Sequence, residues 1–151
     1  WFGDTSRMFM VGEVSIAARR LVNITFEAMW HGIMRVKPGV HLGDIGYAIQ
    51  KFAEGHGFSV VRDFVGHGIG SAMHQPPNVP NYGKPGKGAK LTLGLALAVE
   101  PMVTMGSKHT LVAEDDHDLV WEPGRHHDKV CSDEDCECHT RARVGRRHDE
   151  W

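Results

Sequence analysis

The sequence predicts one domain of interleaved helices and strands, of the α+β or α/β class, followed by a polar tail. Segments with a helical hydrophobic period alternate with short apolar runs that are typical of strands, and this texture ends near Ala113. Hydrophobic residues make up 41% of the 151 residues, which is enough for one domain with a hydrophobic core. Residues 114–151 are too charged to bury a core of their own, so we expect residues 1–113 to fold and this tail to be disordered.

Two helices are predicted within the first part. The first extends from about Glu13 to Val36, because Pro38 and Gly39 follow and break a helix. Its expected apolar stripe consists of Ile16, Leu21, Ile24, Ala28, Ile33 and Met34. The second helix extends from Leu42 or the next residue to about Glu54. Its expected apolar face consists of Ile45, Ala48, Ile49 and Phe52.

Three short apolar runs are predicted to be strands. They are Arg7–Val11, Phe58–Val61 and Leu95–Val99, and the last is apolar throughout, which is typical of a buried strand. Residues 75–90 are rich in Pro, Gly and Asn, and this composition predicts a long loop.

Charge and cysteine content narrow the classes of function. Seventeen Lys and Arg nearly balance 19 Asp and Glu, so net charge favours neither a nucleic-acid nor a membrane partner. No apolar run approaches the roughly 20 residues of a membrane span. The three cysteines, Cys131, Cys136 and Cys138, lie close together near one end, which is a poor disulfide framework. We therefore expect a cytoplasmic protein.

Three polar residues lie at the ends of predicted strands, where buried chemistry is often placed. Asp4 precedes the first run, His67 lies between two glycines, and Glu100 follows the run that ends at Val99. A carboxylate at the end of a buried strand needs a cation or a donor to offset its desolvation. One imidazole and two carboxylates form a mixed N/O ligand set that suits Mn, Fe, Co or Zn. Each residue alone is more typical of a turn, a cap or a hydrogen-bonded structural position.

Together with their neighbours these residues form motifs that resemble bacterial type I methionine aminopeptidases. The motifs are Gly66-His67-Gly68-Ile69-Gly70, His74 with Pro76-Pro77-Asn78-Val79-Pro80-Asn81-Tyr82-Gly83, and Ala98-Val99-Glu100-Pro101-Met102-Val103. Asp4-Thr5-Ser6 and Val36-Lys37-Pro38-Gly39 fit the same family in order and spacing. The resemblance covers residues 1 to about 113.

The resemblance implies the α+β pita-bread fold, in which two similar halves surround a curved antiparallel sheet with two metal ions at its centre. It implies that Asp4, His67 and Glu100 are metal ligands, with Asp4 bridging both ions. It further implies that His74 is catalytic, because the matching histidine contacts the scissile amide and stabilises the tetrahedral intermediate. Met73 matches a position that lines the methionine pocket, although it equally suits a plain core methionine.

The implied reaction removes the N-terminal methionine of a nascent protein, with a small second residue favoured. Two divalent ions (Co, Mn, Fe or Zn) would activate water for attack on the methionine carbonyl. The implied partners are the N-termini of nascent proteins, with association at the ribosome. Neither a nucleic acid nor a membrane is an implied partner. Two alternatives stay open: an Xaa-Pro aminopeptidase-like hydrolase, and a non-catalytic pita-bread module that binds a peptide or a partner protein.

Two departures from the family pattern limit these expectations. The chain begins after the position of the family's first metal aspartate, and the strand that bears a glutamate before His-Thr is not recognisable. Glu137-Cys138-His139-Thr140 matches that motif without the apolar strand it requires. We therefore expect a C-terminal part of such an enzyme, with impaired activity. A zinc site at the tail cysteines and His139 is a further reading, although their crowding is atypical of structural zinc.

Overall fold

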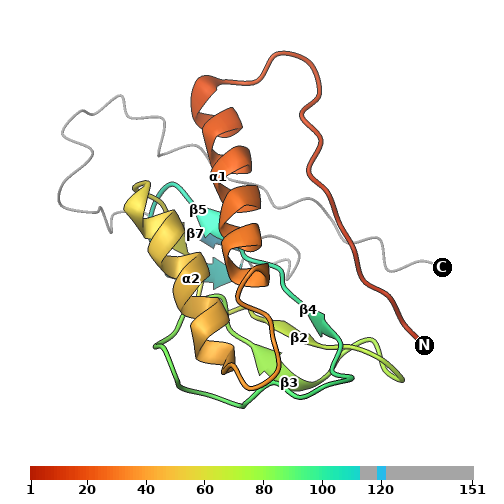
Figure 1. The fold of residues 1–151 in the computed structure, drawn as a ribbon. Coiled ribbons are helices and arrows are strands. Elements are labelled where there is room, and N and C mark those ends of the chain that lie inside the picture. The colour runs from red at the N-terminus through yellow and green to blue at the C-terminus, as the bar shows by residue number, and fades with distance from the viewer. Residues whose placement is uncertain (113–118, 122–151) are drawn as a thin grey trace.

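The computed structural model describes residues 1–112 and 119–121, which form two helices and seven short strands. The helices α1 (Ile16–Ile33) and α2 (Leu42–Gly55) come first and pack side by side (Figure 1). The strands follow in order: β1 (Ser59–Val60), β2 (Gly66–Gly68), β3 (Gln75–Val79), β4 (Leu97–Ala98), β5 (Val103–Thr104), β6 (Thr110–Val112) and β7 (Leu119–Trp121). Within the described residues, no helix is both long and apolar enough to cross a membrane.

Helix α1 begins at a side-chain cap and is buried only where it meets α2. The hydroxyl of Ser15 accepts a hydrogen bond from the backbone N–H of Ala18 at 3.1 Å, which satisfies an otherwise unpaired donor of the first turn. The buried residues of α1 are Ala28 and Gly32. The expected stripe is therefore wrong at its two ends, because Ile16 and Met34 lie beyond this contact and are exposed.

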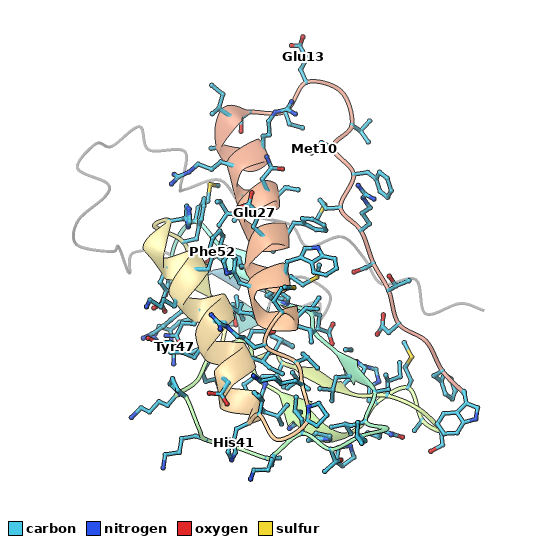
Figure 2. The ribbon with its side chains drawn as sticks, viewed as in Figure 1. Met10, Glu13, Glu27, His41, Tyr47 and Phe52 are labelled. Atoms are coloured by element: carbon cyan, nitrogen blue, oxygen red, sulfur yellow. The ribbon has the colours of Figure 1, made fainter. Side chains whose placement is uncertain are left out.

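Helix α2 confirms its predicted bounds, and its cap involves a distant loop. The Asp44 carboxylate accepts hydrogen bonds from the backbone N–H groups of His41 and Gly86, each at 2.9 Å. These two bonds hold the pKa of Asp44 below its ordinary value; the nearby charges of His41 and Arg35 lower it further, while burial opposes them. Figure 2 shows His41 at the end of α2 where this cap lies.

The Asp44 cap predicts a pH-dependent stability. The pKa of Asp44 is lower in the folded chain, so its ionised carboxylate contributes to folding stability. This contribution is present above the ordinary carboxyl pKa of about 4 and is lost as pH falls through the lowered folded value. Asp44→Asn should therefore lower the melting temperature at neutral pH, and the difference from the unaltered chain should shrink in acid. Thermal denaturation between about pH 7 and pH 3 measures this difference in melting temperature. Glu27→Gln, on the exposed side of α1, is the control, and an equal pH trend in both variants would contradict the cap.

The strands form three small antiparallel sheets. β2 lies at the centre of a three-stranded sheet in the order β3-β2-β4, while β1 pairs with β5 and β6 pairs with β7. In the three-stranded sheet His67 lies opposite Ala98 on one side and opposite Asn78 on the other. This sheet brings residues that are far apart in sequence to the two flanks of His67.

Strand β3 corrects the loop prediction for residues 75–90. Gln75–Val79 pairs with β2, and only the part after it is loop. Proline cannot donate to a ladder, but β3 is an edge strand of its sheet, and the register shifts between His67 and Gly68 opposite Pro76 and Pro77. Composition alone therefore predicts a loop where an irregular edge strand forms.

The hydrophobic core lies between α2 and the strands. Its buried residues are Ala28, Leu42, Ile45, Ile49, Ala53, Val60, Val79 and Leu91. Leu97 and Val99 pack against this core but are only partly buried, so the prediction of a buried strand at Leu95–Val99 is wrong in its length and its burial. These side chains are only partly covered because they border an open apolar cleft of about 290 Å³. The cleft is lined by Ile33, Val36, Leu95, Leu97 and Val99.

The N-terminal segment is extended but is not a strand. The run Arg7–Val11 was predicted to pair, yet it has no strand partner within the described residues, and Met8, Phe9 and Val11 are exposed. A strand requires a neighbour for its backbone groups, which hydrophobicity alone does not supply. Figure 1 shows the segment descending from α1 to the three-stranded sheet, and Figure 2 shows Glu13 at its outer turn.

The predicted boundary near Ala113 falls beside a hairpin. β7 pairs with β6 in the register Thr110–Trp121, so the first part of the predicted tail includes a strand. The remainder of residues 114–151 lies outside the described residues. The expectations for Glu137, for the cysteines and for His139 lie there too and remain predictions.

Candidate metal centre

His67 occupies the middle of β2, and its flanking glycines are required by the neighbouring strands. A Cβ atom on Gly66 would lie 2.2 Å from the carbonyl oxygen of Ala98 in β4. A Cβ atom on Gly68 would lie 2.4 Å from the carbonyl oxygen of Pro76 in β3. The two glycines thus let three backbones approach closely and confine the imidazole between them.

The Gly68 carbonyl orients the imidazole of His67. Its Nδ1 lies 2.9 Å from that carbonyl oxygen, so Nδ1–H donates there and Nε2 faces the site. His67 is 6% exposed, and Nε2 has no hydrogen-bond partner within the described residues. A backbone carbonyl on Nδ1 with a buried, unpartnered Nε2 is the arrangement of a metal-binding histidine.

Two carboxylates converge on the same nitrogen. Oε1 of Glu100 lies 3.2 Å and Oδ2 of Asp4 lies 3.6 Å from Nε2 of His67. Two carboxylates this close to one nitrogen call for a positive charge beside them, which either a bound cation or a proton on the imidazole would supply. Bonds of about 2.1 Å to one ion place neighbouring ligand atoms roughly 3.0–3.4 Å apart. The observed separations are therefore close to those of ligands that share an ion.

His74 stands beside this group. It directly precedes β3, and its ring centroid lies 4.2 Å from that of His67 with an interplanar angle of 53°. Unlike His67, His74 is exposed, so its ring is open to a molecule that approaches the carboxylates. The preceding residue, Met73, is partly buried.

The donor set fits a divalent ion but does not complete a centre. Neutral imidazole and carboxylate oxygens suit Mn, Fe, Co and Zn. Within the described residues, no group of three or more His, Cys, Asp or Glu side chains forms a finished metal-binding cluster. Asp4 and Glu100 therefore lie beside Nε2 of His67 as candidate ligands, and the three residues do not form a complete site. An ion held there would require further ligands, such as water or other side chains.

Different backbone segments and hydrogen bonds place the two carboxylates beside His67. Asp4 is brought in by the N-terminal segment, where the backbone N–H of Phe2 donates to the carbonyl of Gly70 at 2.8 Å. Glu100 follows β4, and its carbonyl accepts a hydrogen bond from the buried side chain of Asn81 at 3.2 Å. Asn81 has no individual role that can be predicted from sequence alone, where its place within Pro80-Asn81-Tyr82 is the one available signal.

The fold and this site define an α+β protein in which one imidazole and two carboxylates come together. The model of metallopeptidase family M24 matches residues 1–122. Methionine aminopeptidase of Rickettsia prowazekii is 51% identical over 114 residues, which are 76% of this chain and 44% of that protein. Methionine aminopeptidase B of Synechocystis is 56% identical over 107 residues, which are 71% of this chain and 39% of that protein.

Solved structures agree with the sequence comparisons. The methionine aminopeptidase of Thermotoga maritima matches with a TM-score of 0.73 at 42% identity, over 78% of this chain and 47% of that one. The chain belongs to metallopeptidase family M24, and its helices and sheets form part of the pita-bread fold. The family uses divalent metal. The chain spans about half, or less, of the length of the relatives it matches (39–49% of the first five).

The four residues singled out from the sequence are therefore neighbours in space. Asp4, His67 and Glu100 surround one nitrogen, and His74 lies against the same ring. Their chemical roles remain predictions. The strand expected after Asp4 is absent from the described residues, so Asp4 is placed by the bond to Gly70 and not by a ladder.

Proposed function

We propose that this chain supplies metal ligands and a catalytic histidine to a methionine aminopeptidase. The observation that carries the proposal is the convergence of Asp4 and Glu100 on the unpartnered Nε2 of His67. The substrates would be the N-termini of nascent cytoplasmic proteins at the ribosome, and the complete site would hold two divalent ions. Calorimetric titration with Mn²⁺ tests the metal site directly: saturable binding supports it, and no binding at millimolar Mn²⁺ rejects it.

The proposed roles of the residues follow from their burial and position. When bound, the metal supplies Lewis-acid polarisation and lowers the pKa of water. Asp4, His67 and Glu100 would hold it, and the Gly68 carbonyl fixes the His67 ring so that Nε2 points into the site. His74 is exposed beside them and would donate a hydrogen bond to the oxygen that gains charge during attack.

His74→Ala should lower turnover and leave metal affinity unchanged. Removing one donor that stabilises a developing oxyanion costs about 100- to 1,000-fold in kcat. Because His74 makes a ring contact with His67 but no ion pair with Asp4 or Glu100, Mn²⁺ affinity should stay within a factor of about 3. Peptide hydrolysis and calorimetry measure the two effects. His109→Ala, at an exposed histidine remote in sequence, is the control, and a parallel loss of metal affinity in His74→Ala would identify a ligand instead.

The identity of the substrate distinguishes the proposed enzyme from its nearest alternative. The Mn²⁺-loaded chain should release methionine from Met-Ala-Ser faster than it cleaves Xaa-Pro peptides. The high identity to two methionine aminopeptidases favours this preference. The reverse preference would support the Xaa-Pro aminopeptidase-like hydrolase.

A non-catalytic peptide-binding module is a second candidate. The observation that favours it is the absence of a finished metal-binding cluster among the described residues. Such a module would bind peptides with no dependence on divalent ions. Peptide binding that survives a strong chelator, together with no Mn²⁺ binding, would favour the module over the enzyme.

A further inference from the structure

We propose that Asn81 is a positioning residue for Glu100, and that its buried amide holds the bend on which this carboxylate stands. The inference rests on the proposed function, because it treats Glu100 as a ligand of a divalent ion. Asn81 itself does not contact the other candidate ligands in any described hydrogen bond; its partner is the Glu100 backbone.

Glu100 lies where the chain leaves one sheet and enters another. Before it, β4 (Leu97–Ala98) pairs with β2, and after it, β5 (Val103–Thr104) pairs with β1. Neither ladder includes Glu100. The next residue, Pro101, has no backbone N–H and favours extended conformations at Glu100, which narrows the direction of the Glu100 carbonyl but supplies no donor for it. That carbonyl therefore needs a partner outside both sheets.

Asn81 is that partner. Its Nδ2 donates to the Glu100 carbonyl at 3.2 Å, and the side chain is fully buried, with 0% exposed. Because water does not reach this amide, loss of the donor would leave the carbonyl unpaired. Ala98 lies opposite His67, and Glu100, two residues further along the chain, has its Oε1 3.2 Å from Nε2 of His67. A rotation at the bend would thus move the carboxylate away from Nε2 of His67.

Helix α2 fixes the loop that carries Asn81. A Cβ atom on Gly46 would lie 2.3 Å from the carbonyl oxygen of Tyr82 and 2.6 Å from that of Pro80, so the loop backbone lies directly against the helix. The backbone N–H of Gly83 also donates to the Gln50 side chain at 3.2 Å. Asn81 therefore links the packing of α2 to the position of Glu100.

The test is Asn81→Asp in the complete chain, with Mn²⁺ affinity measured by calorimetry. The carboxylate has the shape of the amide but cannot donate when ionised, so we expect affinity to fall about 10- to 100-fold, as for other groups that orient metal ligands. Asn23→Asp makes the same chemical change on the exposed side of α1 and should leave affinity unaltered. If Asn81→Asp does not fold, Asn81→Ser is measured with the same expectation, because its shorter side chain does not reach the carbonyl and adds no charge.

A second control distinguishes the proposed positioning role of Asn81 from a general contribution to stability. Ile49→Val trims the buried core without touching the bend, so it should lower the denaturation midpoint and keep full Mn²⁺ affinity. Unchanged affinity in Asn81→Asp, with binding intact in the unaltered chain, would overturn this inference alone. No Mn²⁺ binding by the unaltered chain would overturn the proposed function, and this inference with it.

Discussion

His67→Ala is expected to lower the Mn²⁺ affinity of the chain by more than about 100-fold. Groups that only orient a ligand cost about 10- to 100-fold when they are removed. His67 should cost more, because both carboxylates converge on its Nε2 at 3.2 and 3.6 Å. Without the imidazole, Asp4 and Glu100 have no common neighbour to hold an ion between them. Calorimetric titration measures the loss.

Two further variants test whether the loss of Mn²⁺ affinity is due to the missing imidazole of His67. His67→Gln retains a polar side chain of similar length in the buried position and should also lose most of the affinity, because an amide is a weaker ligand than imidazole. His109→Ala removes an exposed histidine and should retain full affinity. Circular dichroism establishes that each variant is folded. Retention of Mn²⁺ binding by folded His67→Ala would contradict the site.

Gly66→Ala is expected to destabilise the fold by about 3 kcal/mol or more, at the upper end of overpacking substitutions. The added Cβ would lie 2.2 Å from the carbonyl oxygen of Ala98, which is backbone and is unable to move away as a flexible side chain would. β4 would have to separate from β2, so the sheet that carries His67 would open. Urea denaturation measures the change in unfolding free energy, and Mn²⁺ affinity should fall with it.

Gly55→Ala is the matched control for this substitution. Gly55 is the last residue of α2, and a Cβ there meets nothing within 4 Å. Alanine favours the helix over glycine by about 0.5–1 kcal/mol, so this variant should be neutral or slightly more stable. Equal destabilisation by the two substitutions would show that the close approach of β2 and β4 is not what requires glycine at Gly66.

The sequence alone was sufficient for features that depend on near neighbours. The helical period located both helices, and α2 begins and buries Ile45 and Ile49 as predicted. The glycine-flanked histidine and the carboxylate after an apolar run singled out His67 and Glu100 as candidate ligands, and the structure places Oε1 of Glu100 3.2 Å from Nε2 of His67. The motifs around them indicated the family, to which the whole of residues 1–122 is matched.

The tertiary structure decided what depends on a distant partner. The apolar run Arg7–Val11 is not a strand because no strand lies beside it within the described residues, whereas the proline-rich Gln75–Val79 is a strand because β2 does. Likewise, the amide of Asn81 is significant only because the Glu100 carbonyl, 19 residues away in the chain, points at it. Periodicity reports how a segment buries one of its own faces, but strand pairing and buried hydrogen bonds require both partners to be placed.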